Sequence, residues 1–215
     1  MPSTAAAQPV FQTAPDTIVV PPAAKKQPRR ITWREFERRY LSREDNYKYE
    51  WRHGWVEKTK CTMNPMQLYL QFNLQELFMR LKTTGKVSGQ LLPETDLFFF
   101  QDVHRRPDFA WLTHQQVNNL TREQAIEIPA FIIEVISTYD AAQKIVDKMR
   151  DYRAAGVQVL WLIFPIQQEV HVYSGLHLES MTVCTGEKIC SAAPALPEFS
   201  FPVSALFQKS AEQDN

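Results

Sequence analysis

The chain has 215 residues, of which 44% are hydrophobic and 12% aromatic, enough for a buried core and too many for a chain that is disordered throughout. Its 24 basic and 24 acidic residues balance, which disfavours nucleic-acid binding driven by overall charge but leaves room for a locally basic groove. No apolar run approaches the roughly 20 residues of a membrane helix.

The N-terminal half predicts an arm followed by a helix, a hairpin and a second helix. Residues 1–28 are rich in Ala, Pro, Thr and Gln and predict a disordered arm. The basic cluster near its end (Lys25, Lys26, Arg29 and Arg30) could contact phosphates or serve only as a solubilising tail. Thr32 and Glu35 have the spacing of a capping box at a helix start. A hairpin is expected over 47–59, and an apolar stripe predicts a helix over 66–83.

The C-terminal half alternates strands with helices. Strands are expected over 95–100 and 106–112, joined by a short polar link, then helical material over 113–127. The apolar run 131–137 predicts a central strand covered on both faces, and a helix over 140–155 should end at Gly156. Strands over 157–164 and 169–174 follow. The pattern predicts an α/β fold on a mixed sheet, with a domain over 29–180 and a mostly irregular C-terminal extension over 181–215.

The three cysteines are Cys61, Cys184 and Cys190. Their odd number and the absence of a CxxC pair argue against a disulfide framework and a cysteine zinc site. The N-terminal sequence also lacks the charged and apolar regions of a secretory signal. We therefore expect reduced thiols, a cytoplasmic location and no association with membranes.

Glu134 is the most informative residue, because it interrupts the apolar strand 131–136. A carboxylate on a buried strand needs a metal ion, a basic side chain or backbone donors. An ordinary buried ion pair is the alternative. Asp108, at the start of the neighbouring expected strand, could finish a turn or share a cation with Glu134. Mg²⁺ is typically held by one or two carboxylates and water, and such a site can cleave phosphodiesters.

Lys148 lies at the edge of the core-facing stripe formed by Ile145, Met149 and Tyr152 on the helix after Glu134. Its ammonium could extend into solvent. It could equally lean over the sheet toward Glu134 and stabilise charge on a phosphate undergoing attack. Lys144, one turn earlier, should lie further from the core.

These residues, in this order, resemble the Uma2 family. The resemblance is carried by Pro107-Asp108, Glu134-Val135-Ile136-Ser137, Lys148, Tyr152, Gly156-Val157 and Leu160-Trp161-Leu162-Ile163, together with Tyr49-Glu50, Gly54 and Val56-Glu57. It covers about residues 45–175, and the spacing from Glu134 to Gly156 is its strongest part. The family belongs to the PD-(D/E)xK nuclease superfamily.

The resemblance implies a restriction-endonuclease-like mixed β-sheet flanked by helices and a metal-dependent DNA endonuclease. Asp108 and Glu134 would be metal ligands, and Lys148 matches the family's recurring lysine. The lysine that the superfamily places two residues after the glutamate is Ile136 here. The chain also has Ser137-Thr138-Tyr139 for the family's Ser-Pro-Ser, Lys144 for an aspartate and Gln67 for a histidine.

Four further residues are weaker candidates for the site. A hairpin centred near residue 102 would set Asp96 opposite Asp108, where it could share the metal or simply face solvent. Glu50 could reach the site or form an ordinary salt bridge. Arg105 and Arg106, next to His104, could contact a DNA backbone or form a solvated turn.

The leading hypothesis is a Mg²⁺-dependent endonuclease acting on double-stranded DNA, with a homodimer as one option for its assembly. Its alternatives are a catalytically inactive relative that binds DNA or a protein partner, and a different metal-dependent hydrolase that uses the same acids. Motifs of P-loop, dinucleotide-binding and α/β-hydrolase proteins do not occur in the sequence.

Overall fold

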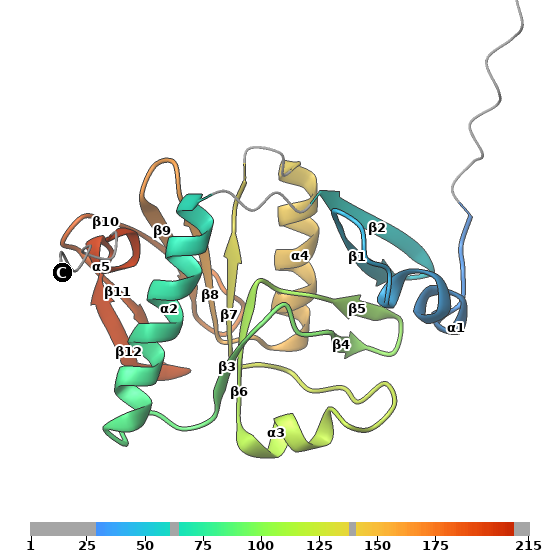
Figure 1. The fold of residues 1–215 in the computed structure, drawn as a ribbon, viewed down its shortest axis with the longest axis horizontal. Coiled ribbons are helices and arrows are strands. Elements are labelled where there is room, and N and C mark those ends of the chain that lie inside the picture. Colours follow the sequence, from blue (N-terminus) through green and yellow to red (C-terminus); the bar gives the residue numbers. More distant parts are fainter. Residues whose placement is uncertain (1–28, 61–64, 138–140, 209–215) are drawn as a thin grey trace, which may run out of the picture.

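The computed structural model describes residues 29–60, 65–137 and 141–208. The expected arm (1–28), Cys61 and the start of the helix expected at residue 140 lie outside this part of the chain. A six-stranded mixed sheet forms its centre, in the order β10-β9-β8-β7-β6-β3 (Figure 1). Its strands are β3 (Gln90–Pro93), β6 (Phe109–Leu112), β7 (Phe131–Val135), β8 (Val159–Phe164), β9 (Glu169–Ser174) and β10 (Ser180–Thr185).

Strands β7 and β8 are the parallel pair of this sheet, and the other pairs are antiparallel. A parallel pair needs a crossover, here helix α4 (Ala142–Ala155). The helix ends at Gly156, whose φ of +86° gives the left-handed cap that the sequence predicts. The expected α/β fold on a mixed sheet flanked by helices is therefore confirmed.

Two hydrophobic cores lie on opposite faces of this sheet, because successive side chains of a strand point to opposite sides. Phe131 and Ile133 of β7 pack with helix α2 (Pro65–Thr83) and the C-terminal strands. Ile132 packs in the second core with Tyr152 of α4. Glu134 continues this second alternation, so its carboxylate faces α4.

A four-stranded sheet in the order β2-β1-β5-β4 lies beside the central one. It comprises β1 (Tyr47–Arg52), β2 (Trp55–Lys60), β4 (Leu97–Phe100) and β5 (Val103–Arg105). The expected hairpin of 95–100 with 106–112 is wrong, because β4 pairs with β5, and β6 belongs to the other sheet. Pro107 explains the break, since proline has no N–H to give to a strand ladder.

The short helices depart from the expected lengths. Helix α1 (Trp33–Phe36) has Thr32 as its N-cap, accepting from the Glu35 N–H as predicted, and continues into η1 (Glu37–Leu41), a π-helical turn. Helix α3 (His114–Asn119) is only six residues long. The expected helix to residue 127 is absent because residues 121–124 are exposed and have no apolar face to bury.

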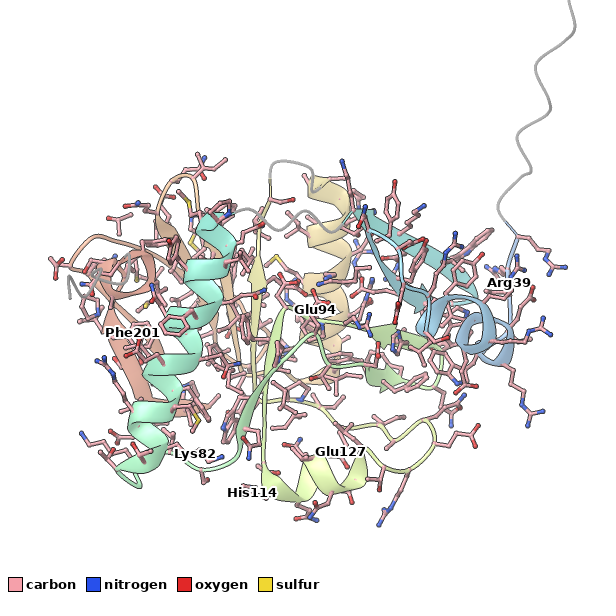
Figure 2. The ribbon with its side chains drawn as sticks, viewed as in Figure 1. Arg39, Lys82, Glu94, His114, Glu127 and Phe201 are labelled. Carbon is pink, nitrogen blue, oxygen red and sulfur yellow. The ribbon has the colours of Figure 1, made fainter. Side chains whose placement is uncertain are left out.

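The C-terminal segment is regular rather than irregular. After β10 it forms β11 (Ile189–Ala192), β12 (Leu196–Pro202) and helix α5 (Ser204–Phe207). Pro197 and Pro202 are tolerated because β12 pairs on one side only, with β11. Phe199 and Phe201 of β12 belong to the same core as α2, and Figure 2 shows Phe201 beside that helix.

Candidate metal-binding and catalytic site

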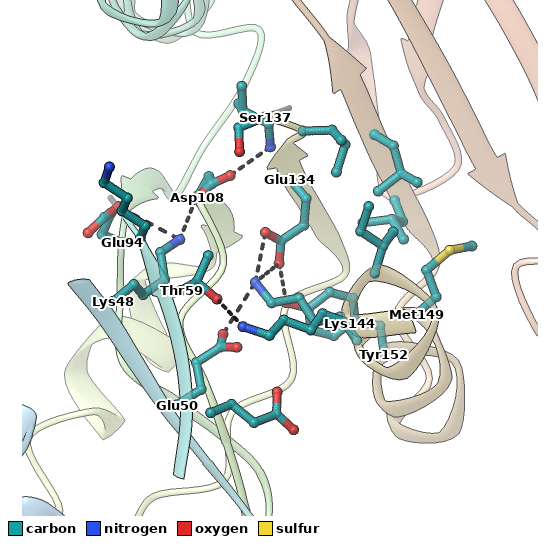
Figure 3. A pocket seen from close by; sticks show the side chains of 18 of the residues that line it. Lys48, Glu50, Thr59, Glu94, Asp108, Glu134, Ser137, Lys144, Met149 and Tyr152 are labelled. Atoms are coloured by element: carbon teal, nitrogen blue, oxygen red, sulfur yellow. Dashed lines mark hydrogen bonds and ion pairs between the residues drawn. The ribbon is translucent and has the colours of Figure 1, made fainter. Parts of the chain in front are cut away.

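A pocket, partly open to solvent, lies between α4, the α4-facing side of β7 and the β1–β2 hairpin (Figure 3). Its lining includes Asp108, Glu134 and Lys148, the three residues for which the sequence predicts a catalytic role. They come from the start of β6, from β7 and from α4. Residues far apart in the sequence therefore meet in a single pocket.

Asp108 and Glu134 face each other across two antiparallel strands. Phe109 pairs with Ile133, so the register places Asp108 opposite Glu134. The N–H of Val135 donates to Asp108 Oδ2 at 2.6 Å, which fixes one oxygen of this carboxylate. The sequence predicts that the two acids lie at the ends of neighbouring strands, and the structure places them there.

Lys148 leans over the sheet rather than into solvent. Its Nζ lies 2.9 Å from both carboxylate oxygens of Glu134 and 3.3 Å from Glu50 Oε1. Its side chain is only 14% exposed. Helix α4, which follows β7, thus places an ammonium group against the carboxylate of that strand.

Tyr152 is a member of the site that the sequence assigns only to the core. It follows Lys148 by one helical turn, and its hydroxyl donates to Glu134 Oε1 at 2.5 Å. Burial and the nearby carboxylates raise the pKa of Tyr152 well above its ordinary value, which keeps the phenol a donor. The helical spacing of Lys148 and Tyr152 was the available signal.

Lys48 is a second lysine of the site that sequence reasoning missed. Its Nζ donates to Asp108 Oδ1, lies 3.1 Å from the carbonyl oxygen of Arg106 and 3.7 Å from Glu94 Oε1. The side chain is 9% exposed. The signal in the sequence was alternation, because Lys48 and Glu50 share one face of the hairpin strand.

Electrostatics differ between the two proposed metal ligands. Burial alone would raise the pKa of Asp108, but Lys48 and Lys148 outweigh it and hold that pKa below the ordinary value. Burial dominates at Glu134 and, with the charges of Asp108 and Glu50 nearby, raises its pKa. For both lysines the surrounding carboxylates overcome burial and raise the pKa, so both remain ammonium ions.

Glu50 joins this pocket to a buried ion-pair network. Its Oε2 lies 3.1 Å from Arg105 Nη1, while its Oε1 accepts from the N–H of Arg106 at 2.8 Å. Burial would raise the pKa of Glu50, but Lys148 and Arg105 lower it to about 2. Glu50 is therefore a charged link between Arg105 and Lys148.

Arg105 is an interior residue, which is at odds with the expected contact to a DNA backbone. Its side chain has no exposed surface, and its guanidinium also pairs with Glu57 at 2.5 Å and Asp151 at 2.6 Å. Position 105 is the last residue of β5 and faces α4 rather than a turn. Arg106 is 27% exposed and donates to Asp96 Oδ2 at 2.9 Å.

Asp96 does not join the pocket. Leu97 pairs with Arg105, so the register sets Asp96 opposite Arg106, and not opposite Asp108 as a hairpin centred at residue 102 would require. His104, on the same strand as Arg105, is fully buried, and its ring packs against Trp33 and Phe98. The ion pair with Arg106 gives Asp96 a role at the sheet edge.

The donor set fits a Mg²⁺ ion bound by two carboxylates. A carboxylate offers about four lone-pair sites. Among the described residues, the recorded contacts use two of these sites on Asp108 and three on Glu134. No three His, Cys, Asp or Glu residues within the described ranges form a metal-binding group. Mg²⁺ commonly takes only one or two carboxylates and keeps several waters.

Lys144, at the position of the family's aspartate, also lines the pocket. Its Nζ donates to the carbonyl oxygen of Lys58 at 2.5 Å and lies 3.3 Å from Thr59 Oγ1. It therefore binds the edge of the β1–β2 hairpin rather than an acid of the pocket. Gln67, at the position of the family's histidine, lines the same pocket.

The central sheet, its crossover helix and the pocket at the end of β7 define a nuclease-type α/β domain. A family model, Uma2, described as "Putative restriction endonuclease", matches residues 33–204, and the chain belongs to this family. The match extends beyond residue 180, where the sequence predicts the domain to end, and takes in strands β10, β11 and β12.

A solved structure shows the same fold. It is the 1.96 Å crystal structure of a "putative nuclease belonging to DUF820" from Anabaena variabilis ATCC 29413. The superposition has a TM-score of 0.63 and covers 77% of this chain and 92% of that one, at 18% sequence identity. No curated protein matches the chain. No helix in the described part of the chain is both long and apolar enough to cross a membrane.

Proposed function

We propose that this protein is a Mg²⁺-dependent nuclease of the PD-(D/E)xK type that hydrolyses phosphodiester bonds of double-stranded DNA. The observation that carries the proposal is the convergence of Asp108, Glu134 and Lys148 in one pocket. Membership of a restriction-endonuclease family supports a nucleic acid as the substrate.

Asp108 and Glu134 would hold the metal ion, which when bound supplies Lewis-acid polarisation of the phosphate. The Val135 N–H orients Asp108, and Tyr152 orients Glu134, so both carboxylates are fixed before substrate arrives. This preorganisation lowers the cost of forming the site during the reaction.

Lys148 would stabilise the negative charge that develops on the phosphate oxygens during attack. Its ammonium is held between Glu134 and Glu50, on the wall of the pocket formed by α4. A charge in a largely buried position acts more strongly than the same charge in water. Lys148 is therefore the cationic member of the proposed catalytic group.

The test is DNA cleavage by two variants that preserve side-chain shape, Asp108→Asn and Glu134→Gln. We expect each to abolish Mg²⁺-dependent cutting of supercoiled and linear DNA while the protein stays folded. Near-wild-type cutting by either variant would contradict the metal-site assignment.

A catalytically inactive DNA-binding relative is the second candidate, and Lys144 is the observation that favours it. An ammonium at this position replaces the family's acid and is engaged with the hairpin backbone. Under this alternative the wild-type protein binds DNA without cutting it, with or without Mg²⁺, and Asp108→Asn leaves its affinity unchanged. The same cleavage and binding assays separate the two functions.

A further inference from the structure

Lys48 occupies an unusual position for a lysine. It lies on β1 with its side chain 9% exposed, and the whole four-carbon stem is directed into the pocket between the two sheets (Figure 3). Lysine is almost never this buried unless it is paired. Its partners are therefore the key to its role.

Oxygen atoms surround the Lys48 ammonium on three sides. An ammonium has three N–H donors, and the neighbours of Nζ are Asp108 Oδ1, the Arg106 carbonyl oxygen at 3.1 Å and Glu94 Oε1 at 3.7 Å. Two of the three carry negative charge. Such a set of oxygens suits a metal cation as well as it suits an ammonium ion.

Lys148 differs from Lys48 in the exposure of its second acidic partner, which is 4% for Glu50 and 42% for Glu94. Lys148 bridges Glu134 and Glu50. Because Glu50 is not a proposed metal ligand, Lys148 keeps Glu50 as an acidic partner when Glu134 binds a metal ion. The second acid near Lys48 is Glu94, which is 42% exposed. Lys48 can therefore move toward Glu94 and solvent once Asp108 is taken.

We propose that Lys48 competes with the divalent cation for Asp108, so that metal binding requires Lys48 to leave Asp108 Oδ1. The inference rests on the proposed function, in which Asp108 is a metal ligand. Oδ1 keeps a second lone pair, but a metal ion bound there would lie within a few ångströms of the Lys48 ammonium, and these like charges repel. Lys48 thereby sets the metal concentration at which the site forms, and it makes the affinity lower than two carboxylates alone would give.

The experiment is isothermal titration of the DNA-free protein with Mn²⁺, which replaces Mg²⁺ at oxygen sites and gives a readout independent of cleavage. We expect Lys48→Met to bind Mn²⁺ about ten-fold more tightly than wild type. Lys48→Arg retains the charge and should stay near wild type. Lys144→Met is the matched control, because it removes a pocket lysine whose partners are Lys58 and Thr59 rather than Asp108.

Thermal unfolding provides a second readout. Without metal, Lys48→Met leaves the buried Asp108 without its ammonium and should melt at a lower temperature than wild type. Added Mn²⁺ should then raise its melting temperature by more than that of wild type, because the gain grows with affinity. If Lys48→Met does not fold, Lys48→Gln removes the charge with a polar side chain and is judged by the same criteria.

The outcomes separate this inference from the proposed function. Equal or weaker Mn²⁺ binding by Lys48→Met, with binding by wild type that Asp108→Asn abolishes, overturns the competition and leaves the metal site intact. An equal gain in Lys144→Met also overturns it, because the effect would then be general charge repulsion. Absence of Mn²⁺ binding in both wild type and Lys48→Met overturns the metal site and the inference together.

Discussion

Lys148 Nζ lies 2.9 Å from each carboxylate oxygen of Glu134, although the two residues belong to different elements of the chain. The contact joins the α4 crossover to the strand that it follows. Since both groups are largely buried, the pair contributes to the fold and to the proposed chemistry at once. Experiments on this pair must therefore measure stability and activity separately.

Lys148→Met keeps most of the side-chain volume and removes the charge. We expect turnover of DNA to fall by about 100-fold or more, because the ammonium no longer stabilises the developing phosphate charge. We also expect a lower melting temperature, since Glu134 loses its buried partner. Single-turnover cleavage and thermal unfolding, measured on the same sample, check both results.

Lys144→Met is the control for Lys148→Met, one turn earlier on the same helix. It removes a contact with the Lys58 carbonyl and should change cleavage far less. If Lys144→Met abolishes cleavage and Lys148→Met retains it, the catalytic lysine has been assigned one turn too late.

Tyr152→Phe removes only the hydroxyl that donates to Glu134. The ring is fully buried and packs against Phe99 at 5.0 Å, so the packing should survive. Loss of a hydrogen bond to a charged group should lower the free energy of unfolding by about 1.5–3 kcal/mol. Urea denaturation measures this, with Tyr173→Phe on β9 as a comparison expected to change stability by less than about 0.5 kcal/mol.

The acid sensitivity of the fold should depend on Glu50. Its folded-state pKa of about 2 lies below the ordinary 4.5, so its contribution is fully present above pH 4.5 and is lost as the pH falls toward 2. We expect Glu50→Gln to be less stable than wild type by a few kcal/mol at neutral pH. The difference should narrow below pH 4.5, as urea unfolding at several pH values would show.

Glu35→Gln is the comparison for this pH series. Glu35 also has a lowered pKa, which its bond to Arg39 chiefly causes, but its ion pairs lie on the surface. Its removal should leave the pH dependence of unfolding almost unchanged. If the loss of stability at low pH is unchanged in Glu50→Gln, the acid sensitivity of the fold arises from other groups.

Arg105→Met should unfold the protein rather than weaken DNA binding selectively. The substitution leaves Glu50, Glu57 and Asp151 without their shared cation, and breaking a buried ion pair costs about 3–5 kcal/mol. Arg39→Met, which changes an exposed arginine labelled in Figure 2, should lower the free energy of unfolding only slightly. A stable Arg105→Met protein with reduced DNA affinity would contradict this expectation and support a direct contact between Arg105 and DNA.

DNA binding should be weak and strongly dependent on salt, because the net charge is zero and only local clusters can meet phosphates. Arg34 of α1 and Arg38 of η1 are exposed and suited to this role. Each phosphate contact should add about −0.9 to the slope of log affinity against log salt. DNA titrations of Arg34→Gln and Arg38→Gln at several salt concentrations should show a shallower slope. An unchanged slope would exclude these two arginines as phosphate contacts.

The meeting of Asp108, Glu134 and Lys148 in one pocket was predictable from the sequence because its signals are local. A charge inside an apolar strand identifies Glu134, and one helical turn relates Lys148 to the core stripe. The capping residue Thr32 and the helix end at Gly156 follow from equally local rules.

The missed features depend on pairing between distant segments. Whether Arg105 faces solvent or the interior is decided by β5 joining β1, about fifty residues earlier, and no periodicity in three residues can show it. The role of Lys48 likewise requires Asp108 to be placed opposite it. The C-terminal strands were missed because prolines argue against a strand only when both of its edges are paired.

The side chains of β7 alternate between two cores, which restricts insertions and deletions within this strand. Inserting or deleting one residue between Ala130 and Glu134 would exchange the two faces, presenting a hydrophobic side chain to α4 and moving the acid toward α2. In the turn between β10 and β11, a side chain added at Gly186 would meet nothing within 4 Å, and a change of length there does not exchange the faces of β7. Functional relatives should therefore vary in loop length there and keep the count of residues in β7 fixed.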